Sequence, residues 1–299
     1  AAISESALTS IKAFNPQHLS NTSWAFSPLD VANPPLLPAI SAAAIATIGD
    51  ADAQGVGALL DAGVRGEALE RSLEEVLERL RAVLPSTWAG WQEAATATGM
   101  APLPLLTQAG LRADSLGTIG TDRLLRSWQM SCAREDVGAR AWAALEATGA
   151  STGTGAWAFL EYDIDIASAG LGNSASPSAA GAELRLRGSW LAAAMLGEAV
   201  PWWACSSPLR PLALTVRPAV DRAACAEFQL CSRLVATVLA DLEQSPGGRC
   251  DELAAIAAKV QGNVKLFASA TPCLSCVAAL RQVQSLFPRI HLEITYGGN

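Results

Sequence analysis

Charge is scarce in this chain of 299 residues, of which 16% are Asp, Glu, Lys or Arg and 51% are hydrophobic. A chain of this length and composition can build one large domain or two small ones, each with a real core. Basic charge is in deficit, since the net charge is −7. This argues against tight, sequence-independent nucleic-acid binding by the whole chain, which needs a basic surface. The deficit lies in residues 1–210, with 13 basic and 21 acidic side chains, whereas residues 211–299 carry 8 and 7.

Long apolar runs are also missing. The longest, at residues 36–48, is too short to span a bilayer, and the stretch at 190–205 is interrupted by Glu198 and Pro201. No basic segment precedes an apolar one at the N-terminus, so no signal peptide is indicated. The first residue is Ala, from which we expect a fragment or a processed form. We interpret the protein as soluble and intracellular, with no membrane partner.

The seven cysteines lack the spacing of a small disulfide scaffold. Five of them lie between positions 225 and 276. This favours a reducing compartment and a metal site over a disulfide framework. A second C-x-x-C is absent, which excludes a complete zinc ribbon.

Residues 1–150 have the pattern of a mostly helical, repeat-like region. Apolar residues recur at helical period over 67–84, and 36–48 is rich in Ala and Ile. Residues 15–19 and 52–56 align at an offset of 37, a period typical of stacked helical hairpins. Residues 14–26 resemble the helical repeats of organellar RNA-binding proteins of the FAST-kinase and octotricopeptide type. That resemblance implies RNA contact in an organelle. The alternative is that Trp24 and Phe26 are core anchors. The acidic balance of this region also makes a protein partner almost as strong an expectation as RNA.

Residues 151–185 are rich in Gly, Ser and Ala, and we interpret them as a linker. Within them, 161–166 alternates acidic and apolar side chains. Three carboxylates on one face can bind a metal, but an exposed strand with a solvated face is the more common meaning of such a pattern. The linker separates the helical region from a domain at 186–299.

From residue 211 the pattern predicts an α/β unit. We expect a strand at 212–216, a helix capped by Asp221 and running to about 242, a short helix at 251–260 and a turn at 262–263. A strand at 264–268 follows, then a helix to about 286 with Thr271 as cap and Pro272 at its first position, and a last strand at 290–296. The last helix then crosses between two parallel strands.

The residues that carry chemistry are Cys225 and Glu227, followed by Pro272, Cys273 and Cys276. Cys273 and Cys276 are three positions apart at a helix start, so both thiolates project from one face. Cys225 lies at the start of the preceding helix. If both helices begin at one edge of the sheet, the three sulfurs converge and leave a fourth position for water, as a catalytic zinc requires. Glu227 can then reach that water without binding the metal.

This C-x-E…P-C-x-x-C pattern resembles that of the zinc deaminases of nucleobases. Residues 211–299 look most like the cytidine-deaminase-like domains of bacterial polymorphic toxins. The resemblance implies an α/β/α fold, a Zn²⁺ on Cys225, Cys273 and Cys276, and Glu227 as proton shuttle. It further implies hydrolytic deamination of a base in single-stranded RNA or DNA. The sequence departs from most of the superfamily in having Cys225 where His is usual, and in ending right after the last strand.

Other readings stay open at this point. C-x-x-C alone can be half of a zinc ribbon or a redox pair, Cys225 alone can be a core thiol, and Glu227 alone a solvated helix residue. His291 lies on the strand predicted at 290–296, and the sequence does not show which face of the sheet its side chain occupies. It is not expected to be a metal ligand. The enzyme can act on a free nucleoside or nucleotide instead of a polymer. The chain can also be a helical-repeat RNA-binding protein with a zinc-stabilised scaffold, although a scaffold has no use for Glu227. Neither the base, cytosine or adenine, nor the compartment follows from the pattern.

Overall fold

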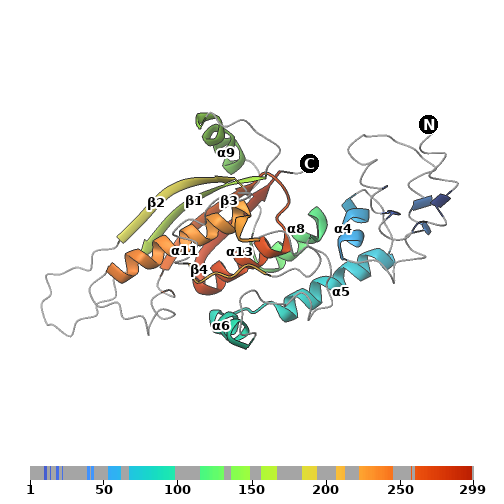
Figure 1. Ribbon diagram of the computed structural model, residues 1–299, viewed down its shortest axis with the longest axis horizontal. Coiled ribbons are helices and arrows are strands. Elements are labelled where there is room, and N and C mark those ends of the chain that lie inside the picture. The colour runs from blue at the N-terminus through green and yellow to red at the C-terminus, as the bar shows by residue number, and fades with distance from the viewer. Residues whose placement is uncertain are drawn as a thin grey trace, which may run out of the picture.

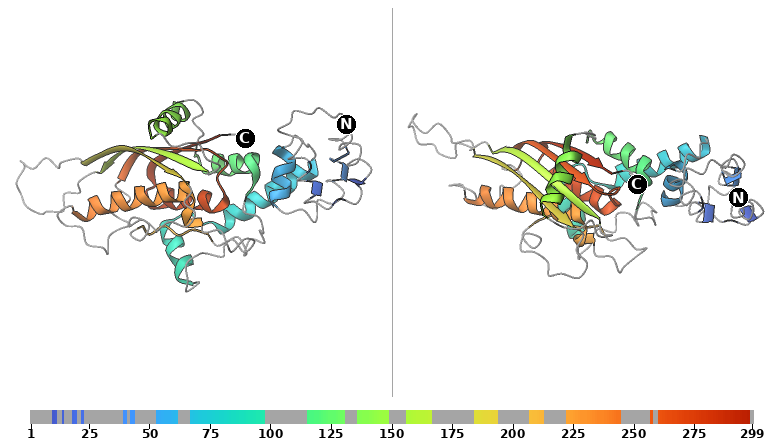
Figure 2. Two further views of the ribbon diagram at one scale, coloured as in Figure 1. Left: turned by 45° about the horizontal axis from the view of Figure 1, so that its top comes forward. Right: turned by 90° about the horizontal axis from the view of Figure 1, so that it is seen from above.

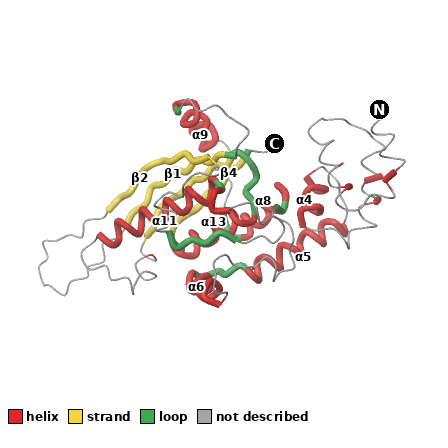
Figure 3. The backbone as a smooth tube through the Cα atoms, viewed as in Figure 1, coloured by secondary structure: helices red, strands yellow, loops and turns green. Residues whose placement is uncertain are grey.

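The computed structural model shows a mixed α/β protein, which confirms the α/β class (Figure 1). It describes residues 53–61, 67–97, 115–130, 136–148, 156–166, 184–193, 207–212, 222–244 and 260–297, with shorter pieces at 10–11, 14, 18–19, 22, 39–40, 42–43 and 257. The helices and strands of these parts are shown by type in Figure 3.

One four-stranded sheet forms the centre of the described structure. Its strands are β1 (Trp157–Ile166), β2 (Leu184–Ala193), β3 (Val260–Ala268) and β4 (Arg289–Tyr296), in the order β2-β1-β3-β4. β1 is antiparallel to both of its neighbours, and β3 is parallel to β4. Helix α13 (Leu274–Leu286) connects β3 to β4, so the predicted crossing between two parallel strands is confirmed.

β1 corrects the interpretation of residues 157–166 as part of a linker. All ten of its residues pair with β2, and nine of them also pair with β3. The alternation at 161–166 did indicate a strand, but the Gly- and Ser-rich composition of residues 151–185 favoured a linker over a strand of the central sheet. The expected domain boundary at residue 186 therefore falls inside β2, a strand that pairs with β1 along its whole length.

Helices cover both faces of this sheet. Helix α11 (Ala226–Gln244) and α13 pack on one face, and α9 (Asp136–Ala147) lies across part of the other (Figure 2). The strands supply apolar side chains to both sides. Leu160 and Ile164 of β1 belong to the main core with α11, whereas Trp157 and Phe159 form a smaller cluster with α9. Side chains alternate between faces along a strand, so β1 contributes apolar side chains to the clusters on both faces of the sheet.

The helical region packs against the same core. It comprises α4 (Ala53–Asp61), α5 (Glu67–Val83), α6 (Trp88–Ala97) and α8 (Gly117–Ser127). The predicted amphipathic helix is confirmed as α5, which buries Leu69, Leu73, Leu77 and Leu80. Its buried leucines belong to the same continuous cluster as α11 and α13. The Trp91 indole of α6 donates to Ser285 Oγ of α13 at 3.3 Å, which joins the two regions directly.

The start of α8 is fixed by contacts with α4. The Asp61 carboxylate, at the end of α4, accepts hydrogen bonds from the backbone N–H groups of Thr118 and Ile119 at 2.6 and 2.9 Å. It thus supplies the cap that orphan N–H groups at a helix start require. Gly57 lets α4 approach so closely that a Cβ there would lie 2.0 Å from the Leu116 carbonyl oxygen.

Gly262 lies in a strand, where the sequence predicted a turn. The turn predicted at 262–263 is wrong, because both residues lie within β3 and pair with β1 and β4. Gly262 has φ +144°, and a Cβ on it would lie 2.2 Å from the Asp163 carbonyl oxygen. A glycine in a strand often marks such a close backbone approach. In the sequence alone, such a glycine cannot be distinguished from the glycine of a turn.

Replacing Gly262 with alanine should destabilise the protein by about 1–3 kcal/mol, because the added methyl meets backbone on the facing strand. Urea unfolding followed by circular dichroism measures this change. Gly138→Ala is the matched control, since a Cβ at this α9 position makes only ordinary contacts of 3.5 and 3.7 Å with the Phe267 ring. That variant should equal or exceed the wild type in stability, because Ala favours a helix over Gly. Equal stability of the two variants would contradict the proposed close approach.

Several expectations fall largely or wholly outside the described residues. These are the apolar helix at 36–48, the first copy of the repeat at 15–19, the RNA-binding-like segment at 14–26, the strand at 213–216, and most of the short helix at 251–260. The second copy of the repeat, at 52–56, overlaps the start of α4 from residue 53, and residue 260 belongs to β3 and not to a helix. Leu212 itself is buried but is not in a strand. Within the described part of the chain, none of the helices combines the length and apolar character needed to cross a membrane.

Candidate metal centre

Two helix starts bring the predicted site residues together. Cys225 lies at the bend between the short 3₁₀ helix η3 (Arg222–Ala224) and α11, and Glu227 is in the first turn of α11. Cys273 is the N-cap of α13, and Cys276 is in its first turn. The predicted cap at Thr271 is therefore wrong by two residues. Cys273 has the extended backbone typical of a cap (φ −71°, ψ 164°) but makes no side-chain capping bond, which leaves its sulfur to face the other cysteines.

The three sulfurs form a compact cluster. Their Sγ atoms all lie within 4.8 Å of one another, and Cys273 Sγ is 3.5 Å from Cys276 Sγ. Three thiolates around one tetrahedral zinc, at about 2.3 Å each, would lie about 3.8 Å apart. Cys276 is buried, and Cys225 and Cys273 are half-buried. The cluster therefore has the ligand type, the spacing and the partial exposure that a metal ion with one open position requires.

The electrostatics of the cluster favour a cation. Hydrogen bonding with Cys225 and Cys273, burial and the nearby Glu227 charge raise the pKa of the Cys276 thiol well above its usual range. A hydrogen bond to Cys273, together with burial, likewise raises the pKa of Cys225. Three thiolates side by side repel one another unless a cation neutralises them. Metal binding here must release protons and is expected to weaken at low pH.

Glu227 lies against the cluster. Its side chain is 7% exposed, and its Oε2 accepts a hydrogen bond from Cys276 Sγ at 3.3 Å. It comes from the first turn of α11, where the partial positive charge of the helix start favours a carboxylate. The same effect at the starts of α11 and α13 favours thiolates near those ends. A buried carboxylate beside three potential ligands is in reach of a molecule bound at the open position.

The other candidate residues lie elsewhere. Cys231, one turn along α11, is buried and outside the three-sulfur cluster. His291 is exposed on β4 and pairs with Glu293 at 3.3 Å, with no part in the cluster. The remaining three cysteines, at 132, 205 and 250, lie outside the described residues.

Sequence reasoning missed the contribution of α8 to this end of the sheet. Thr118 Oγ1 lies 3.1 Å from Oγ1 of Thr271, the residue two before Cys273. The Tyr296 hydroxyl, at the end of β4, donates to the Thr118 carbonyl at 3.3 Å. The loop that leads into the cysteine pair is thus held by a helix more than 140 residues earlier. No local pattern signals such a contact, because it depends on how distant elements pack.

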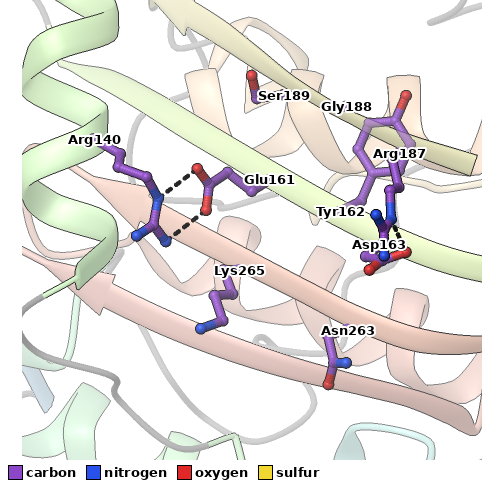
Figure 4. Close-up of a pocket in the computed structure, with 9 residues that line it drawn as sticks. All are labelled: Arg140, Glu161, Tyr162, Asp163, Arg187, Gly188, Ser189, Asn263 and Lys265. Atoms are coloured by element: carbon purple, nitrogen blue, oxygen red, sulfur yellow. Dashed lines mark hydrogen bonds and ion pairs between the residues drawn. The ribbon is translucent and has the colours of Figure 1, made fainter.

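The acidic side chains of β1 occupy the opposite face of the sheet and make ion pairs (Figure 4). Glu161 accepts two hydrogen bonds from Arg140 at 2.7 Å, and Asp163 accepts from Arg185 and Arg187 at 2.8 Å. These arginines hold the pKa of the Asp163 carboxyl well below its usual range. Asp165 also contacts Arg185, at 3.5 Å. The three carboxylates do share a face, and each of them pairs with an arginine.

Comparison with known proteins gave no match: no family model fits the sequence, and neither a curated protein nor a solved structure is significantly similar to it. The chemistry of the site must therefore be argued from its own residues.

Proposed function

We propose that the chain is a zinc-dependent deaminase that converts cytosine to uracil in single-stranded RNA or DNA. The observation that carries the proposal is the placement of a buried carboxylate, Glu227, within 3.3 Å of one of three clustered cysteine sulfurs. Three protein ligands are typical of catalytic zinc, whereas structural zinc has four. Zinc deaminases of bases use His-Cys-Cys or Cys₃ ligand sets with a glutamate that is not a ligand.

The residues fit the ion, and each then has a role. Cys225, Cys273 and Cys276 would hold zinc, which when bound lowers the pKa of a water molecule to near 7. With zinc in place, the Glu227 carboxylate would serve as the group that moves a proton from the attacking water to the ring nitrogen of the base. It then assists the departure of the amino group as ammonia. The overall reaction consumes one water and releases one ammonia for each cytosine converted to uracil.

A purely structural zinc site explains less of the arrangement. A scaffold needs no carboxylate next to its sulfurs, and burying Glu227 there is unfavourable, because nearby thiolates repel it. The cost is understandable if the carboxylate moves protons. The helical elements within 53–130 share the core of the α/β part and contact Thr271 and Tyr296. A deaminase of free nucleosides needs no such additional region, so its presence supports a polymeric substrate. The acidic charge of residues 1–210 would suit a protein partner, and we propose no further role for such a partner.

The test is direct. Purified, zinc-loaded protein is incubated with single-stranded RNA, single-stranded DNA, cytidine and adenosine, and the polymers are sequenced while ammonia is assayed. Cytosine-to-uracil changes with matching ammonia are expected in a polymer. Ammonia from cytidine alone would move the substrate to the free nucleoside, and release from adenosine would change the base. Zinc-loaded protein that releases no ammonia from any of the four would overturn the proposal.

A further inference from the structure

Cys225 lies on a turn, not within a helix, and something must hold that turn in place. It occupies the bend between η3 and α11, and the residues before η3, at 213–221, are outside the described structure. Metal ligands must be held to within about 0.5 Å of their productive positions by supporting contacts. Cys273 and Cys276 have the first turn of α13 for this purpose. Cys225 needs another support.

Gln229 supplies contacts of this kind. Its backbone N–H donates to the Cys225 carbonyl at 3.0 Å, as the first helical bond of α11. Its side-chain Nε2 donates to the carbonyl of Ala224, the residue just before Cys225, at 2.9 Å. The same Nε2 donates to the Ala193 carbonyl at the end of β2, at 3.3 Å. One amide therefore ties the ligand-bearing turn both to its own helix and to the edge of the sheet.

Because Gln229 is buried, losing its hydrogen bonds would cost free energy. The residue is only 4% exposed, so water cannot easily replace the amide as a partner for the two carbonyls. Removing the donor leaves two buried acceptors unpaired, which costs about 1–3 kcal/mol each if the turn stays where it is. The turn can avoid this cost by moving toward solvent, and that movement carries Cys225 away from the other two sulfurs.

We propose that Gln229 is a positioning residue that holds the Cys225 sulfur in register with Cys273 and Cys276. The inference rests on the proposed metal site, and it adds a residue that binds neither metal nor substrate. It predicts that the amide of Gln229 sets metal affinity and coordination geometry, and does more than stabilise the fold.

Gln282 offers a matched control. It is also a buried glutamine, 1% exposed, and its amide makes the same kind of bonds to backbone. Its Oε1 accepts from the Arg210 N–H at 3.0 Å, and its Nε2 donates to the Arg210 carbonyl at 2.8 Å. Gln282 lies six residues past Cys276 on α13, about 9 Å along the helix axis, and its bonds hold the segment at 207–212, not a sulfur.

The experiment compares Gln229→Met and Gln282→Met in the full chain. Methionine keeps the length of the side chain and removes both amide hydrogen-bonding atoms. Zinc affinity is measured by competition with a chromophoric chelator, and geometry by the thiolate-to-metal absorption of the cobalt(II)-loaded protein. Gln229→Met should lower zinc affinity about 10–100-fold, the usual effect of losing a group that orients a ligand, and should weaken the cobalt band. Gln282→Met should lower the urea midpoint but leave zinc affinity within about twofold of wild type.

Two outcomes overturn the inference. One is a Gln229→Met protein with wild-type zinc affinity and cobalt spectrum, which would leave the metal site itself standing. The other is a Gln282→Met protein that loses as much zinc affinity as Gln229→Met. The loss of affinity in both variants would then be explained by general destabilisation of the fold. If Gln229→Met does not fold, hydrogen exchange in the wild type decides: the Gln229 side-chain amide protons should exchange slowly, and exchange at the rate of an exposed amide overturns the role. Wild-type protein that binds no zinc would contradict the proposed function as well as the role of Gln229.

Discussion

Replacing Cys273 with alanine should abolish stoichiometric zinc binding. The wild type should carry one zinc per chain, bound by three sulfurs that lie within 4.8 Å of one another. Losing one of three ligands leaves too few to compete with a weak chelator, so metal analysis after dialysis should find almost none. Zinc at about 100 times its dissociation constant stabilises a native state by about 2.7 kcal/mol. This increment, measured as a rise in the urea midpoint on adding zinc, should also disappear in the variant.

Cys231→Ala is the control for this experiment. Cys231 is a buried cysteine of α11 that lies outside the cluster, so the same chemical change should leave the zinc content at one per chain. A Cys273→Ala protein that retains full zinc would show that the metal, if any, is held by other groups. Loss of zinc in both variants would point to unfolding instead of ligand removal.

Glu227→Gln should retain zinc and fold while losing turnover. Glutamine has nearly the same shape, and its carbonyl oxygen can still accept the hydrogen bond that Cys276 Sγ gives to Glu227 Oε2 at 3.3 Å. It cannot take a proton, however, and general acid–base groups contribute about 10²–10⁴ in rate. The value of kcat, measured from ammonia release under saturating substrate, should fall by that factor. Zinc content and the urea midpoint should stay near those of the wild type.

Glu293→Gln provides the matched change at a distance from the cluster. Glu293 is on β4 and pairs with Lys265 and His291 on the opposite face of the sheet, so its variant should keep kcat within about twofold. Wild-type turnover in Glu227→Gln would assign the proton transfer to another group. A zinc-free Glu227→Gln protein would instead make Glu227 part of the metal site.

Local patterns were sufficient to predict the elements that carry the site. α5 and α11, β3, α13 and β4 each have a clear apolar period or a start signal. The sequence further predicted that Cys225, Cys273 and Cys276 converge if the two helices that carry them begin at one edge of the sheet. That edge is where the structure places them. The three sulfurs lie within 4.8 Å of one another there, so the predicted convergence is confirmed. Whether the site binds zinc and deaminates a base stays a prediction.

Contacts between distant segments could not be predicted in the same way. The alternation at 161–166 fits a solvated strand as well as one neutralised by Arg140 and Arg185, and only the packing of α9 and β2 decides between them. Gly262 signals a bend of some kind, but its close approach to β1 depends on a strand about 100 residues earlier. The role of Gln229 depends on the end of β2, which no helical period reveals.

The position of β1 in the sheet has a consequence for how the chain folds during synthesis. β2 begins at residue 184, soon after β1 ends at 166, whereas β3 begins only at 260. The β1–β2 hairpin can therefore form first, but an isolated hairpin is marginal in water. Its apolar face, with Leu160 and Ile164, stays uncovered until α11 and β3 have left the ribosome. Until then the free edge of β1 can pair with other chains, so the nascent chain should depend on chaperones at this stage. Cys273 and Cys276 emerge after β3 and before β4, so the three-sulfur cluster can assemble only after β1, β2 and β3 have been synthesised.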